Sequence, residues 1–171
     1  VSPRNVLLSH EGEVKLTDFG MARARLRVPQ GAAHPPDQYR YTAPEQALGG
    51  APDPRSDIFS IGALLYEMVA GVSPLQAESV EQTLARARAG AVRSVTDLVP
   101  TLSGELAGVI GRALLPEVES RYQTAGELYE DLIHYLYGSG RRVGGHDVAV
   151  YLEELRGGQE PPVQASHSDE V

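Results

Sequence analysis

Two residues near the start of the chain carry side-chain oxygens of the kind that a hard metal cation binds. Asp18 opens the run D-F-G directly after the strand-like run V-K-L-T, and Asn5 closes the run V-S-P-R-N. Magnesium is held in proteins by one or two carboxylates together with phosphates and water. Each residue also has an ordinary alternative, because an aspartate before Gly20 is common in turns and Asn5 could simply end a strand. The chemistry therefore depends on the motifs around these two residues.

Three further runs follow Asp18 in order. A-P-E occupies residues 43–45, S-D-I-F-S-I-G occupies residues 56–62 and E-S-R-Y occupies residues 119–122. D-F-G and A-P-E resemble the two limits of the activation segment of protein kinases, and V-S-P-R-N resembles the end of their catalytic loop. The two later runs resemble the kinase runs S-D-V-W-S-L-G and D-P-x-x-R-[FY]. Over residues 1–137, the chain thus resembles the C-terminal lobe of a serine/threonine protein kinase of bacterial type.

This resemblance implies a site for ATP and Mg²⁺ at the start of the chain. Asn5 matches the asparagine that binds magnesium, and Asp18 matches the aspartate that holds magnesium on the nucleotide phosphates. Both are therefore expected to be catalytic, metal-binding and cofactor-binding residues, whereas Phe19 and Gly20 are expected to be structural. Counting back from Asn5 places the catalytic aspartate one residue before Val1. We therefore expect the chain to be truncated inside its catalytic loop, with the N-terminal lobe absent.

The resemblance also assigns a substrate-binding loop and further structural residues. Asp57 is expected to accept backbone N–H groups of the catalytic loop, because a carboxylate within an apolar helix needs such partners. Glu45 is expected to form a buried ion pair with Arg121, and removing one partner of such a pair costs about 3–5 kcal/mol. The alternative for this pair is two unrelated surface charges. The substrate-binding loop comprises Tyr41, Thr42, Ala43 and Pro44.

Two residues depart from the kinase pattern and leave two functions open. Ser2 stands where serine/threonine kinases usually have a lysine that contacts the transferring phosphate. Gln38 stands where they usually have a threonine that ties the substrate site to the catalytic aspartate. The first function is transfer of the ATP γ-phosphate to serine or threonine of a protein, with this chain inactive by itself. The second is a non-catalytic, pseudokinase-like scaffold that binds other proteins.

Composition limits the partners. The 171 residues carry a formal net charge of −8, which argues against nucleic acid or an anionic membrane as the main partner. The absence of cysteine excludes disulfides and thiol catalysis. No apolar stretch reaches about 18 residues, so no membrane span is expected. We expect a protein substrate and the missing N-terminal lobe as partners. We also expect a cytoplasmic location, compatible with a membrane anchor elsewhere in a longer protein.

The hydrophobic pattern predicts a mainly helical fold with a small β-hairpin. Residues 5–8 and 13–17 are predicted to be strands, and the proline-containing residues 21–42 a loop. Residues 56–70 form a helix pattern that is apolar on all sides and ends at Gly71, which predicts a helix buried at the centre of a bundle. The other predicted helices span residues 77–89, 103–115, 124–137 and 146–156.

These elements predict three parts. Residues 1–137 are expected to form the kinase C-terminal lobe, residues 138–156 a C-terminal helical extension, and residues 157–171 a disordered polar tail. The resemblance also implies that a long helix beside residues 56–70 is missing together with the N-terminal lobe. We therefore expect an exposed apolar surface on the helix at residues 56–70.

Overall fold

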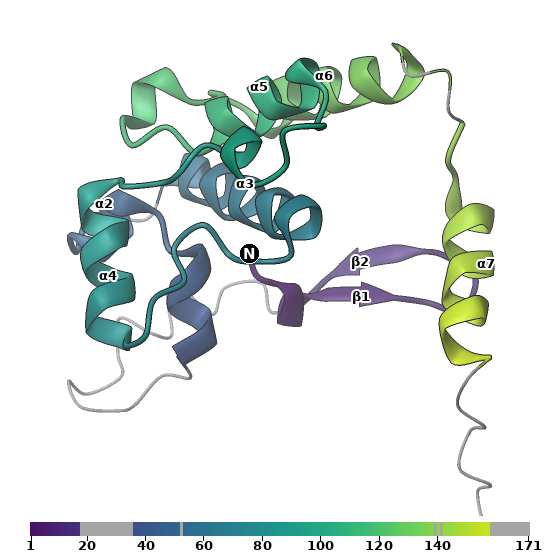
Figure 1. Cartoon of the computed structure of the whole chain (residues 1–171), viewed down its shortest axis with the longest axis horizontal. Helices are drawn as coiled ribbons and strands as arrows, with labels where there is room; N and C mark the ends of the chain where they lie inside the picture. Colours follow the sequence, from purple (N-terminus) through teal and green to yellow (C-terminus); the bar gives the residue numbers. More distant parts are fainter. Residues whose placement is uncertain (18–35, 52, 139, 141, 158–171) are drawn as a thin grey trace, which may run out of the picture. The chain divides into compact units, whose positions relative to one another are not determined.

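The structure is a computed structural model, shown in Figure 1, and the residues that it describes are 1–17, 36–51, 53–138, 140 and 142–157. Asp18, Phe19 and Gly20 lie outside these residues, as does most of the predicted loop at 21–42. The predicted disordered tail lies outside them as well, except for Gly157. The described residues form a mostly helical fold with one two-stranded sheet.

The chain divides into two compact units, which are described separately. The first unit comprises Val1–Val6 and Leu16–Arg142, and the second comprises Leu7–Lys15 and Val143–Val171. Among the described residues of the first unit are four short 3-10 helices: η1 (Pro3–Asn5), η2 (Pro36–Tyr41), η3 (Val95–Asp97) and η4 (Val118–Ser120). Its α-helices are α2 (Pro44–Ala47), α3 (Pro54–Ala70), α4 (Val80–Ala89), α5 (Gly104–Ala113) and α6 (Ala125–Gly138).

Helix α3 is the central element of the first unit, and it contacts η2, η3, α5 and α6. It begins after Asp53, whose carboxylate accepts the Arg55 backbone N–H at 2.7 Å. It ends at Gly71, where a φ of 73° requires the left-handed conformation that glycine adopts without strain. The predicted central helix and its end at Gly71 are therefore confirmed.

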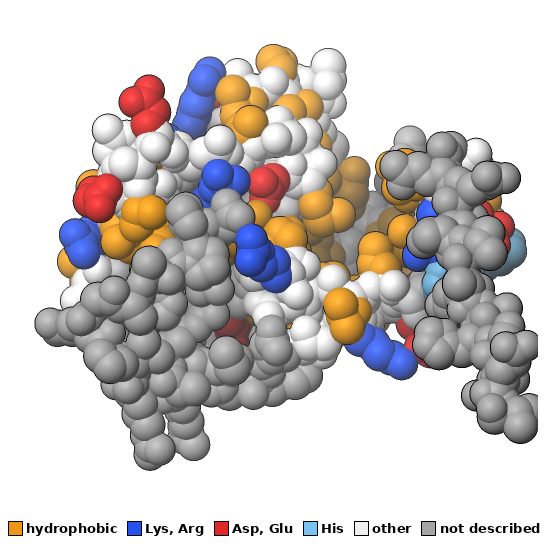
Figure 2. All heavy atoms as spheres, turned by 90° about the horizontal axis from the view of Figure 1, so that it is seen from below, with side chains coloured by type: hydrophobic (Ala, Val, Ile, Leu, Met, Phe, Trp, Pro, Cys, Tyr) orange, Lys and Arg blue, Asp and Glu red, His pale blue; other side chains and the backbone are white. Residues whose placement is uncertain are grey.

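Burial of α3 on all sides, however, is wrong. Phe59 and Tyr66 are buried in the core, but Met68 is 73% exposed. No described element covers the face of α3 that carries Met68. The predicted apolar surface at this helix is present at Met68 and continues at the exposed Val72. Figure 2 shows that hydrophobic side chains also reach the surface elsewhere, among charged ones.

Close approach of α3 and α5 depends on a glycine. Gly62 of α3 is buried, and a Cβ atom added there would lie 2.8 Å from the Cβ of Ala113 in α5. A larger residue at position 62 would push the two helices apart, because such a distance is well below normal van der Waals contact. The S-D-I-F-S-I-G run therefore ends in the residue that allows α5 to cover α3.

Some helices begin or end at other residues than predicted, because the N-cap residue sets where a helix begins. Helix α4 begins at Val80 rather than residue 77, since the Ser79 hydroxyl accepts the Gln82 N–H at 3.2 Å. Helix α5 starts after the predicted cap, Ser103, but ends at Ala113 rather than residue 115. Helix α6 follows the predicted cap Thr124, whose hydroxyl accepts the Glu127 N–H at 3.1 Å.

Two of the short helices that were not predicted lie in or next to the predicted loop. The last residues of the predicted loop, Pro36–Tyr41, form η2, so the loop prediction is wrong there. Helix α2 (Pro44–Ala47) starts with proline, which suits the first turn of a helix because its missing N–H needs no partner. The Gln46 side chain also accepts the Ala43 N–H at 3.3 Å.

The sheet is the predicted hairpin, with strands β1 (Val6–Leu8) and β2 (Val14–Leu16). The antiparallel register follows from two hydrogen bonds, Ser9 N–H to Glu13 O at 2.9 Å and Thr17 N–H to Asn5 O at 2.8 Å. The turn contains Gly12, which has a φ of 78° and therefore suits only glycine well.

Within the second unit, helix α7 (Gly145–Arg156) lies against the hairpin turn. Gly12 and Gly145 are so close that a Cβ atom on Gly12 would overlap the Gly145 carbonyl oxygen. An Arg156 guanidinium nitrogen lies 3.1 Å from Nε2 of His10. The predicted helix at 146–156 is thus present, one residue longer. None of the helices in the described part of the chain is both long and apolar enough to span a membrane.

Candidate functional site

Asn5 is held at the point where η1 leads into β1. Its side-chain oxygen Oδ1 accepts a hydrogen bond from the Ser2 hydroxyl at 2.8 Å. Its carbonyl oxygen accepts the Thr17 backbone N–H at 2.8 Å. Thr17 directly precedes Asp18 in the sequence. The hairpin therefore pairs one predicted metal ligand with the residue next to the other.

The Asp18 side chain itself lies outside the described residues, as do Phe19 and Gly20. For Gln38, the structure describes only the backbone, which belongs to η2. Among the described residues, no group of three or more His, Asp or Glu side chains could hold a metal ion. The amide oxygen of Asn5 is a hard donor that suits magnesium, but a carboxylate for the same ion would have to come from Asp18.

Asp57 lies in the first turn of α3 and is exposed, with 66% of its side chain accessible. Its Oδ1 accepts a bond from the Val1 nitrogen at 3.2 Å. The start of the described chain is therefore connected to α3 through this carboxylate. The apolar pattern of the helix predicted a buried Asp57 carboxylate that needs partners. In the structure this carboxylate faces water, so its charge remains largely solvated.

The predicted substrate-binding loop is anchored on α3. Tyr41 is buried, and its hydroxyl donates to the Glu67 carboxylate. The Ser60 hydroxyl donates to the Tyr41 carbonyl oxygen at 2.8 Å. Ala43 and Pro44 are buried as well, whereas Thr42 is half-buried. The loop thus has a fixed backbone along the central helix.

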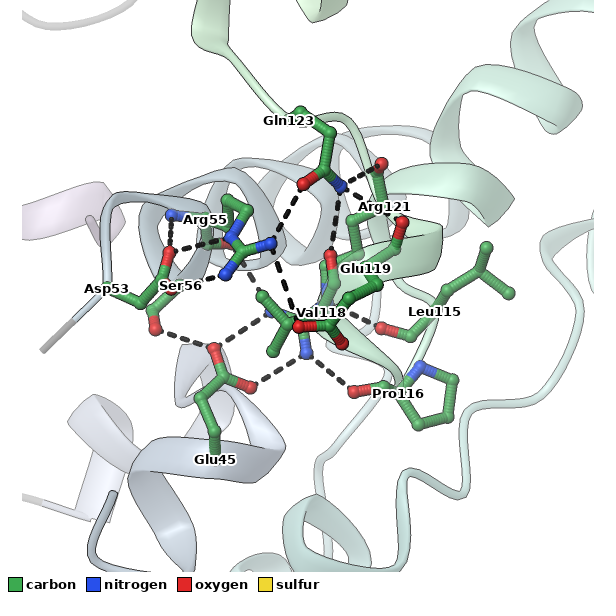
Figure 3. A network of polar contacts seen from close by, with 10 residues as sticks. All are labelled: Glu45, Asp53, Arg55, Ser56, Leu115, Pro116, Val118, Glu119, Arg121 and Gln123. Carbon is green, nitrogen blue, oxygen red and sulfur yellow. Dashed lines mark hydrogen bonds and ion pairs between the residues drawn. The ribbon is translucent and has the colours of Figure 1, made fainter. Parts of the chain in front are cut away.

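Glu45 and Arg121, 76 positions apart in the sequence, form a bidentate ion pair (Figure 3). The Arg121 nitrogens Nη1 and Nη2 donate to the two Glu45 oxygens at 2.9 and 2.7 Å. The Arg121 side chain has no exposed area, and its guanidinium lies over the Phe59 ring at 5.0 Å from the centroid. The Ser56 hydroxyl donates to Glu45 at 2.5 Å. The structure therefore brings together residues of A-P-E, S-D-I-F-S-I-G and E-S-R-Y.

The charge state of Glu45 follows from this environment. Burial by itself would raise the pKa of Glu45, but hydrogen bonds from Arg121 and Ser56 outweigh it and lower the pKa below its usual value. Glu45 therefore remains a carboxylate at neutral pH. Arg121 also donates to the carbonyl oxygens of Leu115 at 2.6 Å and Pro116 at 2.9 Å.

A second part of this network was missed by the sequence prediction. The Arg55 guanidinium donates to the Asp53 carboxylate at 2.7 Å and to the Gln123 side chain at 2.8 Å, which joins the start of α3 to the segment before α6. Asp53-Pro54 at the start of the apolar helix pattern is a common signal for a helix N-cap and could have identified Asp53. Nothing in the sequence indicated the contact with Gln123.

Replacing Asp53 by alanine should cost about 1–2 kcal/mol at neutral pH, because α3 loses its N-cap. Hydrogen bonds from the Arg55 side chain and backbone lower the pKa of Asp53 from 3.8 to about 2. Since the folded-state pKa lies below the unfolded one, this stabilisation is present above about pH 4 and is lost as pH falls to about 2. Urea unfolding of both proteins across this range should therefore show converging stabilities. A constant difference from pH 7 to pH 2 would contradict this.

Comparison with known proteins identifies the family. The protein kinase domain model matches residues 1–134. The chain is 37% identical over 146 residues to the tyrosine-protein kinase MasK of Myxococcus xanthus and 38% identical over 141 residues to the serine/threonine-protein kinase PknB of Mycolicibacterium smegmatis. It is also 36% identical over 142 residues to a probable serine/threonine-protein kinase of Clostridium perfringens.

These matches cover 77–82% of the chain but only 19–22% of each relative. The chain thus spans about a fifth of the length of these relatives. The chain belongs to the protein kinase family, and it resembles bacterial serine/threonine kinases. A mostly helical fold with a two-stranded antiparallel sheet agrees with this assignment.

Proposed function

We propose that residues 1–137 are the C-terminal lobe of a kinase that transfers the γ-phosphate of ATP to serine or threonine of a protein. The observation that carries this proposal is the hairpin register, in which Asn5 pairs with Thr17, the residue before Asp18. Asn5 lies at one end of this hairpin, and Asp18 follows its other end directly in the sequence. Both residues have side-chain oxygens. Residues 138–156 would then be a C-terminal extension and residues 157–171 a disordered tail.

In this proposal, Asn5 and Asp18 hold Mg²⁺ on the ATP phosphates. The ion supplies charge neutralisation of the phosphates during transfer. Phe19 and Gly20 shape the segment that follows Asp18. Residues 41–44 hold the protein substrate, and their fixed attachment to α3 through Ser60 and Glu67 supports this role. Because ATP is a cytoplasmic metabolite, we place this reaction in the cytoplasm.

One contact favours the alternative function, a non-catalytic scaffold. The Ser2 hydroxyl, present where a lysine is usual, donates to Oδ1 of Asn5 at 2.8 Å. This is the oxygen that would face a metal ion, although an amide oxygen has two lone pairs and can accept both. Serine also lacks the positive charge that lysine would offer to the transferring phosphate. The two functions therefore differ in whether the ATP site works with Ser2 in place.

The proposal also implies that the 171-residue chain has no activity alone. A kinase needs a glycine-rich loop and a strand lysine over the phosphates. The sequence contains no G-x-G-x-x-G run, and its single lysine, Lys15, lies in β2. An N-terminal lobe would supply both, so it is the proposed partner of these residues.

A chimera tests the proposal. Residues 1–134 replace the matching segment of Mycolicibacterium smegmatis PknB, and circular dichroism with ATP titration establishes that the PknB chimera folds. With labelled ATP and casein, we expect magnesium-dependent phosphate on serine or threonine, identified by phosphoamino-acid analysis. The 171-residue chain alone should transfer none. A folded chimera that transfers no phosphate would favour the scaffold, and label on tyrosine would refute the proposed acceptor.

A further inference from the structure

A pocket of about 250 Å³ lies in the first unit. Tyr66 of α3 forms one side of it. Val92, in the connection between α4 and η3, forms another side together with Val95 of η3. Helix α5 contributes Ile110, and Leu114 follows directly after this helix. These five residues are mainly apolar, whereas Arg93 and Ser94 add polar groups to the lining. None of the residues predicted for the nucleotide or the substrate lines the pocket.

Tyr66 is 2% exposed, and its hydroxyl makes no hydrogen bond to another described residue. No fully buried side-chain nitrogen or oxygen among the described residues lacks a partner, so this hydroxyl reaches the open space of the pocket. A hydroxyl that faces a pocket can donate to water or to a ligand bound there. Burial raises the pKa of Tyr66, so the hydroxyl keeps its proton at neutral pH and can donate. Since Tyr66 lines the pocket, an acceptor on a bound ligand can take the place of water at this hydroxyl.

The charges near the pocket favour a neutral ligand. Arg93 lines the pocket, but its Nε already donates to the Asp97 carboxylate at 3.3 Å, and its Nη2 donates to the Asp97 carbonyl oxygen at 3.1 Å. Asp97 largely neutralises the guanidinium. An anionic ligand would gain little from Arg93 and would be repelled by Asp97.

The volume limits the size of the ligand. An apolar cavity of about 150 Å³ holds a benzene molecule, whereas pockets for drug-sized ligands start at about 300 Å³. We propose that this pocket binds a neutral ligand of roughly ten heavy atoms, an aromatic ring or a short acyl chain, with one oxygen that accepts a hydrogen bond from Tyr66.

The pocket borders the network around Arg121. Leu115 and Pro116 line the pocket, and their carbonyl oxygens accept the hydrogen bonds from Arg121. Arg121 in turn holds Glu45, next to the predicted substrate loop. A ligand in the pocket therefore contacts the two residues that position this buried ion pair.

Acetophenone, with nine heavy atoms and one carbonyl oxygen, is the test ligand, and ethylbenzene and benzoate are its matched controls. Titrated into the ¹⁵N-labelled 171-residue chain, acetophenone should shift the amide signals of Tyr66, Val92 and Ile110. Benzoate should bind at least tenfold more weakly. The Tyr66→Phe variant should bind acetophenone about threefold to tenfold more weakly and ethylbenzene equally well, because only the hydroxyl is removed.

Two glycines of α5 provide a test of the location. Gly111 lines the pocket and Gly108 does not, and a Cβ atom at either position would meet no atom within 4 Å. Gly111→Leu should abolish acetophenone binding, whereas Gly108→Leu should leave it unchanged. Three results would overturn the proposal: no shifts at the lining residues, benzoate binding as tight as acetophenone binding, or equal acetophenone affinity in Tyr66→Phe. The chain alone is used, so none of these results depends on phosphate transfer.

Discussion

Replacing Arg121 by methionine is expected to destabilise the chain by about 3–5 kcal/mol, because the largely buried Glu45 carboxylate loses its counter-charge. The Arg121 side chain has no exposed area, and only 18% of the Glu45 side chain is exposed. Methionine keeps much of the apolar volume beside Phe59, so the loss comes mainly from the charge and its hydrogen bonds. Urea unfolding followed by circular dichroism measures this loss.

Hydrogen bonds explain why the loss is large. Arg121 donates to both Glu45 oxygens and to the carbonyl oxygens of Arg55, Leu115 and Pro116. Each buried acceptor that is left without a donor costs about 1–3 kcal/mol. A surface arginine is the matched control: Arg93 is 60% exposed in its pair with Asp97, so Arg93→Ala should cost less than about 1 kcal/mol.

A double-mutant cycle separates the ion pair from the other contacts. Glu45→Gln removes the carboxylate charge, so the double variant with Arg121→Met should be more stable than the sum of the two single losses predicts. Additive losses would show that Glu45 and Arg121 do not stabilise each other. A loss for Arg121→Met as small as that for Arg93→Ala would show that the pair is not buried in solution.

The large elements were predictable because their signals are local. The apolar pattern and Gly71 indicated α3 and its end, and Thr124 indicated the start of α6. Caps and backbone turns involve residues only a few positions apart, so the sequence carries them directly. The limits of α4 were less certain, because Ser79 competes with earlier residues as the place where the helix can begin.

Contacts between distant segments were predictable only through motifs. The ion pair between Glu45 and Arg121 was expected because both lie in runs that resemble kinase runs, and the spacing alone would not have suggested it. The contact of Arg55 with Gln123 has no such signal and was missed. The same holds for the close approach of Gly12 and Gly145, which depends on tertiary packing of α7.

The predicted metal site depends partly on local signals and partly on a resemblance to kinase motifs. The position of Asn5 in the hairpin follows from local strand and turn signals, and the structure describes it. Asp18, Phe19 and Gly20 lie outside the described residues, so their roles remain predictions from the motif. The pocket beside Tyr66 carried no sequence signal, because its walls come from three separate elements whose apolar residues read only as core.

In the PknB chimera, Asp18→Asn is expected to lower phosphate transfer at least about 100-fold. Removing one group that stabilises the charge of a transition state typically costs that much, and the Asp18 carboxylate is proposed to be such a group through the magnesium ion. Asparagine has nearly the same size as aspartate, so folding should be kept, and the thermal midpoint of the variant checks this. The transfer rate at saturating ATP and magnesium is the measurement.

An exposed aspartate of the same chain, Asp97, provides the control for the loss of one negative charge. Asp97→Asn removes one negative charge from an exposed pair with Arg93, so it should leave the transfer rate unchanged. Asn5→Ala should lower the rate in the same direction as Asp18→Asn, since both residues are proposed to hold magnesium. Excess magnesium should partly restore the transfer rate of Asn5→Ala, because the proposed ligand Asp18 is still present in this variant. If Asp18→Asn kept the full transfer rate, as Asp97→Asn should, the Asp18 carboxylate would have no part in phosphate transfer. The assignment of the D-F-G run would then be wrong.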